Sequence, residues 1–187
     1  MMKNVGLVGL NDHKFQVDDG QSTSEEIETF RSLVRTVCKD FRAQAVAEEF
    51  CEERVKQRNE KESVCLAEAR SLTLHHRYCD PDTLKRKRCG IRDRTDVQHD
   101  LQVELGEQNP PREKLDAAYR KEDEKRERCW LKELRSLNVW PVVFVCGASH
   151  VEWFKKLLDS DGLSCEVVVS RWPLSEEEGL SGGTGKS

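Results

Sequence analysis

Histidines and carboxylates follow four of the short apolar runs in this sequence, at the points where the runs end. They are Asn11-Asp12-His13, Glu48-Glu49, Asp80-Pro81-Asp82 and Gly147-Ala148-Ser149-His150. If the runs are parallel strands, their carboxyl ends open onto one crevice, which is where ligands collect in open α/β sheets. Imidazoles and carboxylates gathered there could carry out general acid–base catalysis or hold a divalent metal.

His150 and His13 are the candidates for a base in that crevice. His150 follows a turn that Gly147 allows to be tight, although a histidine at this place can also cap a helix or lie on the surface. Asp12 and His13 also suit an ordinary turn. We predict His150 and His13 as catalytic residues and Gly147 as part of a ligand-binding turn.

The adjacent acids Glu48 and Glu49 are the candidate carboxylates, although they would also suit a solvated strand end. Neighbouring carboxylates repel each other, so one of them gains from a nearby cation or a shared proton. We predict Glu48 as the catalytic carboxylate. We assign ligand binding to Glu49, together with Asp80 and Asp82.

A divalent metal in the crevice is an alternative that the sequence leaves open. His13, Glu48 and His150 would supply two imidazoles and one carboxylate, which leaves a coordination position for water, as in catalytic zinc sites. The spacing of these residues does not identify the ion. A zinc site built on cysteine is not expected, because the eight cysteines contain no CxxC pair.

Five apolar runs alternate with helical patterns along the chain. The runs typical of strands lie at 5–10, 44–47, 74–79, 141–146 and 165–169, and the run at 141–146 is uninterrupted, as in a strand buried on both faces. Helical patterns begin near Ser24, behind a capping box of Thr23 and Glu26, and lie at about 62–72, 112–137 and 151–161.

This order of elements predicts one α/β domain over residues 1–172, with a mostly parallel open sheet of about five strands flanked by helices. Residues 83–111 lose periodicity and include the basic run 85–88, so we predict a long loop insertion there. The segment 173–187 is acidic and then rich in Gly and Ser, which predicts a disordered tail.

Composition and charge limit the partners and the compartment. The net charge of −4 gives no reason to expect a nucleic-acid partner, although the run 85–88 could meet an anionic substrate. No apolar run approaches the roughly 20 residues that span a bilayer, so we expect no membrane partner. The start of the chain is unlike a signal peptide, and we expect the protein in the cytoplasm, with free thiols.

Several of these motifs together resemble the TraB/ChaN/Tiki/erythromycin-esterase-like superfamily. The shared features are the late strand followed by Gly147-Ala148-Ser149-His150, an acid after the second strand that matches Glu48 best, and Arg126-Glu127 on a helix with Trp130 and Leu134. The first motif departs from the family pattern GxxH, because Gly9-Leu10-Asn11-Asp12-His13 is one residue longer. The resemblance implies a hydrolytic α/β scaffold whose members cleave esters or peptide bonds, some with a divalent metal, while others bind haem or regulate.

Three hypotheses follow for the function. In the first, His13 or His150 activates water, Glu48 or Glu49 orients it, and Arg126 stabilises a developing oxyanion on a small-molecule or peptide substrate. Water attacks directly, because Ser149 does not lie in a GxSxG motif. The second is a non-catalytic domain that binds a small anion, with 83–111 as a lid. The third is an interaction protein that uses the charged helix 112–137.

Overall fold

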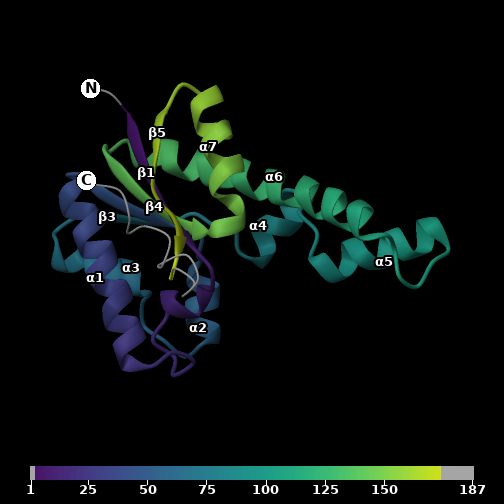
Figure 1. The fold of residues 1–187 in the computed structure, drawn as a ribbon, viewed down its shortest axis with the longest axis horizontal. Helices are drawn as coiled ribbons and strands as arrows, with labels where there is room; N and C mark the ends of the chain where they lie inside the picture. The colour runs from purple at the N-terminus through teal and green to yellow at the C-terminus, as the bar shows by residue number, and fades with distance from the viewer. Residues whose placement is uncertain (1–2, 174–187) are drawn as a thin grey trace, which may run out of the picture.

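The computed structural model describes residues 3–173, which form one parallel sheet with helices on both faces (Figure 1). The strands are β1 (Asn4–Leu10), β2 (Ala45–Glu48), β3 (His75–Tyr78), β4 (Val142–Gly147) and β5 (Ser164–Trp172). Their order in the sheet is β3-β2-β4-β1-β5, and all of the pairs are parallel. The predicted α/β class with about five parallel strands is therefore confirmed.

Each face of the sheet is covered by two helices. The first face carries α1 (Ser24–Asp40) and α3 (Val64–Ser71), and the second carries α6 (Arg112–Leu137) and α7 (Val151–Ser160). The short helix α2 (Glu52–Gln57) follows β2. Within residues 3–173, no helix combines the length and the apolar character needed to cross a membrane.

The side chains of β4 show how the sheet divides the core between the two faces. Val142, Phe144 and Cys146 pack under α6 and α7, whereas Val143 and Val145 pack under α1 and α3. All five are fully buried, as the uninterrupted apolar run predicted. The same period of two in β2 sends Ala45 and Ala47 to the α6 face and Val46 to the α1 face.

Helix α1 begins as its sequence predicted. The Thr23 side chain accepts a hydrogen bond from the backbone N–H of Glu26, and the Glu26 carboxylate accepts one from the backbone N–H of Thr23. Its predicted apolar stripe, including Ile27 and Phe30, is buried against the sheet. This helix fixes the first face of the core.

The prediction of a long loop at 83–111 is wrong, because this segment contains α4 (Thr83–Arg88) and α5 (Arg94–Leu105). Asp82 caps α4 through a hydrogen bond from the backbone N–H of Lys85, and Gly106 ends α5 in a left-handed conformation. Val97 is the only residue of the two helices that is buried. So few buried apolar positions leave almost no helical periodicity for sequence analysis to detect.

Helix α6 has the bounds that its sequence predicted, but only part of it lies on the sheet. Its C-terminal half packs there through Trp130 and Leu134, and its N-terminal half extends beyond the sheet beside α5 (Figure 1). We call α5 and the N-terminal half of α6 the arm. Ala118 and Tyr119, two of its apolar positions by sequence, are partly exposed in it. The predicted tail, apart from Pro173, lies outside the described residues.

The connections between strands place a topological switch point between β2 and β4. From β1 the chain passes to β2 and then β3 through α1 and α3, moving towards one edge of the sheet. From β4 it passes to β5 at the opposite edge through α7, on the other face. Adjacent strands whose connections leave in opposite directions mark the switch point at which α/β proteins bind ligands.

We predict that Leu134→Ala lowers the free energy of unfolding by about 2–5 kcal/mol, because Leu134 is fully buried where α6 meets the sheet. Urea denaturation followed by circular dichroism measures the change. Leu84→Ala is the control, since Leu84 is 58% exposed on α4 and its truncation should cost no more than about 0.5 kcal/mol. Equal losses in the two variants would contradict this packing of α6.

Candidate functional site

Glu49 lies at the switch point, between the carboxyl ends of β2 and β4. Its backbone N–H donates to the carbonyl of Val145 over 2.8 Å, and its Oε2 accepts from the backbone N–H of Gly147 over 2.8 Å. The side chain is 2% exposed and turns to the α6 face, as the alternation of β2 requires. The two strand ends therefore hold this carboxylate in place.

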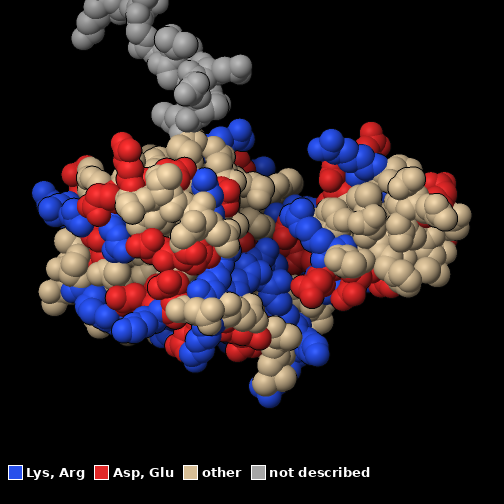
Figure 2. All heavy atoms as spheres, turned by 90° about the horizontal axis from the view of Figure 1, so that it is seen from below, with Lys and Arg blue, Asp and Glu red and all other residues tan. Residues whose placement is uncertain are grey.

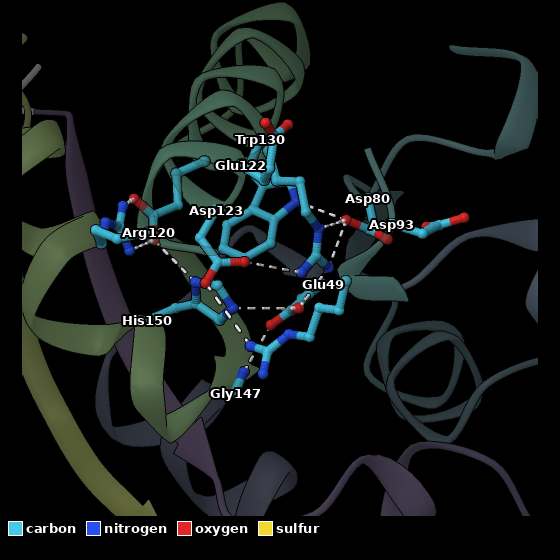
Figure 3. Close-up of polar contacts among 12 residues, drawn as sticks. Glu49, Asp80, Asp93, Arg120, Glu122, Asp123, Trp130, Gly147 and His150 are labelled. Atoms are coloured by element: carbon cyan, nitrogen blue, oxygen red, sulfur yellow. Dashed lines mark hydrogen bonds and ion pairs between the residues drawn. The ribbon is translucent and has the colours of Figure 1, made fainter. Parts of the chain in front are cut away.

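Two histidines from different strand ends converge on Glu49 (Figure 3 shows the His150 side). The Nε2 atom of His13, in the 3-10 turn His13–Gln16 after β1, lies 3.8 Å from Glu49 Oε2. The Nε2 atom of His150, at the end of the turn after β4, lies 3.7 Å from Glu49 Oε1. Glu49, His13 and His150, together with Arg126, are called the His–Glu cluster below.

The other ring nitrogen of each histidine is held by an acceptor. His13 Nδ1 lies 2.6 Å from Gln16 Oε1, and the amide of Gln16 donates to Glu48 Oε2 over 2.9 Å. His150 Nδ1 lies 2.8 Å from Glu127 Oε1, and Glu127 pairs with Arg120. These contacts place a hydrogen on both Nδ1 atoms, so in the neutral rings both Nε2 atoms are acceptors that face Glu49.

Arg126 joins Glu49 to a second buried carboxylate, that of Asp80 after β3. Its Nη2 donates to Glu49 Oε1 over 2.6 Å and to Asp80 Oδ1 over 2.9 Å. Asp80 also accepts from Arg86 over 2.6 Å and from the indole N–H of Trp130 over 3.0 Å. Figure 3 shows Asp80 and Trp130 beside Glu49 in this network.

The charges in this network hold both carboxylates ionised. Burial is the largest single effect and by itself would raise the pKa of Glu49 and of Asp80, but the guanidinium of Arg126 and the other groups around each acid together outweigh burial and hold both pKa values below their usual range. His13 and His150 add to this effect at Glu49, and Arg86 adds to it at Asp80. The site therefore carries fixed negative charge at neutral pH.

His150 has a raised pKa for a different reason. Burial alone would lower its pKa, but the hydrogen bond to Glu127 and then the charge of Glu49 favour the imidazolium and raise the pKa above its usual value. His150 therefore keeps its proton to a higher pH than a free histidine does. It can act as a base only above that pKa.

Gly147 leaves the space in which these groups meet. A Cβ atom on Gly147 would lie 3.1 Å from His13 Nε2 and 3.4 Å from Glu49 Oε2. Both contacts are tight, and the backbone N–H of Gly147 also donates to Glu49. Gly147 therefore lies at the site as predicted, where it lets the first histidine reach the carboxylate.

The structure places Glu48 outside the cluster, on the opposite face of the sheet, so its predicted position beside His150 is wrong. Its fully buried carboxylate accepts from Gln16, from Ser63 Oγ and from His76, whose Nε2 lies 2.8 Å away. Neighbouring residues of a strand point to opposite faces, and Glu49 points to the α6 face. Glu49 therefore takes the position that was predicted for Glu48.

Glu48 is separated from His13 and His150, the other two predicted metal ligands, because it points to the opposite face of the sheet. Within residues 3–173, no group of three or more His, Cys, Asp or Glu side chains is placed to hold a metal ion. The two oxygens of Glu49 already accept from Arg126 and from the backbone N–H of Gly147. The predicted ligand set therefore does not fit the arrangement of these residues.

Of the other predicted ligand-binding residues, Asp80 joins the network and Asp82 lies apart from it at the N-terminus of α4. The sequence analysis missed Gln16 and Arg120, and it named Glu127 only as the neighbour of Arg126 in the family motif, without a role of its own. Glu127 and Arg120 lie seven residues apart on α6, a spacing that puts them on one face of a helix. That spacing was the available signal, but charged residues are common on every face of this helix.

Comparisons of the chain with family models, with curated proteins and with solved structures find no match. The arguments for function therefore come from the geometry of the site.

We predict that Arg126→Met lowers the free energy of unfolding by about 3–5 kcal/mol at pH 7, because it removes the guanidinium that bridges the buried carboxylates of Glu49 and Asp80. In the wild type the lowered pKa values of both acids stabilise the fold above the usual values of 4.5 and 3.8, and this contribution is lost as the pH falls through the folded pKa values. In the variant both acids can bind protons at higher pH. The difference in free energy of unfolding between the wild type and Arg126→Met should therefore become smaller below about pH 4.5. Urea denaturation at several pH values measures it.

Arg128→Met on the same helix is the matched control for this measurement. Arg128 is 63% exposed and pairs with Glu124 on the surface. Its replacement should leave the free energy of unfolding nearly unchanged at every pH. A pH-independent loss in Arg126→Met would show that the two carboxylates do not depend on Arg126 for their charge.

Proposed function

We propose that this protein hydrolyses an ester or amide bond in a small molecule or peptide by direct attack of water at the His–Glu cluster. The observation that carries the proposal is the convergence of two histidine Nε2 atoms on one buried, ionised carboxylate at the switch point of the sheet. The Nδ1 atom of each histidine is engaged, which fixes its ring. Such pre-set geometry is what general base catalysis needs.

We place the attacking water beside the histidines and Glu49. The distances of 3.7 and 3.8 Å exceed a direct hydrogen bond, so neither Nε2 atom is bonded directly to Glu49 and each can accept from a water. A water that donates to Glu49 would present its second proton to a histidine Nε2. His13 is 35% exposed at its side chain and forms the side of the cluster open to solvent, whereas His150 is buried.

His150 is the stronger candidate for the base. When its Nε2 takes a proton, the imidazolium is stabilised by Glu127, which pairs with Arg120 behind it. A carboxylate behind the imidazole supports bases in the same way in hydrolytic triads. Glu49, anchored by Arg126 and Gly147, orients the water and contributes a second negative charge.

Arg126 has a free donor for the oxyanion that forms during attack. Its Nε and Nη2 atoms donate to Asp80 and Glu49, while Nη1 makes no hydrogen bond within residues 3–173. The carboxylate nearest to Nη1 is that of Asp123, at 3.6 Å. A fixed cation beside the attacked carbonyl stabilises the charge that develops in the transition state.

The resemblance to the TraB/ChaN/Tiki/erythromycin-esterase-like superfamily supports the same proposal, with Glu49 as the acid after the second strand. We propose a reaction without a metal, because both oxygens of Glu49 are already occupied by donors of the chain. We place the reaction in the cytoplasm, since the eight cysteines are free thiols and five of them are buried.

A non-catalytic anion-binding domain is the second candidate, and the raised pKa of His150 favours it. Below that pKa, His150 is an imidazolium, so the cluster presents two cations, His150 and Arg126, to a ligand. An anion would then bind best at low pH, whereas hydrolysis would increase as the pH rises. The pH dependence of activity and of binding therefore separates the two functions.

We predict that His150→Gln lowers kcat/KM for p-nitrophenyl esters by about 100-fold or more, because it removes the proposed base. A panel of p-nitrophenyl esters and amino acid p-nitroanilides, assayed with and without EDTA, provides the measurement. His99→Gln is the control, since His99 is 72% exposed on α5. Unchanged hydrolysis by folded His150→Gln protein would remove this histidine from the reaction.

The pH profile of kcat provides an independent prediction. The rate should rise with pH through an apparent pKa above 6.5, the usual value for histidine, because His150 must lose its proton to act. Glu127→Gln replaces the carboxylate that raises this pKa by an uncharged amide, whose oxygen is a weaker acceptor for the imidazolium, so the inflection should move to lower pH. Glu124→Gln, an exposed glutamate on the same helix, should leave the inflection in place. A Glu127→Gln profile identical to that of the wild type would contradict the assignment.

A further inference from the structure

An arginine-lined cavity of about 200 Å³ lies beside the His–Glu cluster, where the arm joins the body of the molecule. Its walls carry five arginines, Arg54, Arg86, Arg92, Arg94 and Arg126, against three carboxylates. Figure 2 shows Lys and Arg side chains gathered in the hollow between the body and the arm. Five guanidinium groups against three carboxylates give the wall of this cavity an excess of positive charge, which favours an anionic ligand.

Two of these arginines have donors that the described residues do not use. Within residues 3–173, the guanidinium of Arg54 makes no hydrogen bond, and its nearest carboxylate oxygen is Asp80 Oδ2, 4.0 Å from Nη2. Arg94 likewise makes none there. It stacks over Tyr119, with its Cζ 4.9 Å from the ring centroid, and its Nη2 lies 3.8 Å from Asp123. Both side chains are therefore ready to donate to a ligand.

The remaining arginines hold the walls of the cavity. Arg86 donates to Asp80 over 2.6 Å and to the carbonyl of Pro81 over 3.1 Å. Arg92, from the loop before α5, donates to Glu122 on α6 over 3.1 Å and so ties the two parts of the arm together. Their carboxylate partners fix these guanidinium groups before any ligand arrives, which lowers the entropy cost of binding.

Arg126 belongs both to the wall of the cavity and to the His–Glu cluster. The Nη1 atom of Arg126 lies 3.6 Å from Asp123, another residue of the cavity wall, and its Nη2 contacts Glu49. On the other side, a second cavity of about 360 Å³ shares Arg54, Arg86 and Arg92 with the first. Only the guanidinium of Arg126 therefore separates a ligand bound at Arg54 and Arg94 from the His–Glu cluster. The adjoining second cavity can hold a further part of the ligand.

We infer that this cavity binds the phosphate group of a phosphorylated small molecule, which is the substrate class of the hydrolysis proposed above, on which the inference rests. A phosphate offers three oxygens and a charge near −2, so it can accept from donors that approach from different directions. Arg54 comes from α2 and Arg94 from the start of α5. A carboxylate has two oxygens in one plane and can be satisfied by one guanidinium fork, whereas two guanidinium groups from different helices suit an anion that accepts from several directions.

Isothermal titration calorimetry of the full chain with inorganic phosphate at low ionic strength tests the inference. Arg54→Gln and Arg94→Gln should each weaken phosphate binding about 10-fold or more, because each removes charge-assisted hydrogen bonds. The control Arg128→Gln changes an exposed arginine of α6 away from the cavity and should bind phosphate like the wild type. Circular dichroism confirms that each variant is folded.

Phosphate binding that is absent in the wild type, or that is weakened equally in all three variants, would overturn the inference. Tighter binding of succinate than of phosphate would overturn the phosphate class. His150→Gln separates this test from the proposed reaction, because it should abolish turnover while phosphate still binds with wild-type affinity. Phosphate binding without any hydrolysis would therefore refute the reaction alone, and hydrolysis without phosphate binding would refute this inference alone.

Discussion

The structure around the site depends on one interaction, the ion pair of Arg126 with Glu49 and Asp80. The two carboxylates follow β2 and β3, and the guanidinium comes from α6, so the pair fixes a helix against two strands. All three groups are largely removed from water, and desolvation of such charges is costly unless every partner is satisfied. Arg126 meets this condition for both acids and still has one nitrogen free. The stability of this region and the chemistry of the cluster therefore depend on the same side chain.

The adjacent acids Glu48 and Glu49 show why sequence could place the site but could not assign it residue by residue. The pattern predicted a strand that ends at Ala47, whereas β2 continues to Glu48. Neighbouring residues on a strand point to opposite faces, so a choice between two identical side chains is a choice between the two faces of the sheet. Nothing local distinguishes them. The pairing with β4 settles which acid reaches His150, and this pairing joins residues about 100 positions apart.

Elements with a strong periodic pattern were predicted well, whereas the positions of buried polar residues were not. The run at β4, the capping box of α1 and the bounds of α6 all follow from apolar spacing and local hydrogen bonds. Helices α4 and α5 bury almost no apolar side chains, so their sequences resemble a loop. Glu127 was named beside Arg126 but was given no role, for the opposite reason. It is buried on a helix covered with charged residues, and a buried glutamate has the same sequence signature as a solvated one.

The misassigned Glu48 nevertheless belongs to the support of the cluster, and this shows how the two faces of the sheet cooperate. From the α1 face, Glu48 holds the amide of Gln16, which fixes the ring of His13. From the α6 face, Arg120 holds Glu127, which fixes the ring of His150. Each histidine is thus oriented by a buried carboxylate, directly or through one amide, and both rings point to Glu49. The two acids that are neighbours in sequence point to opposite faces of the sheet, and each then orients or faces an imidazole.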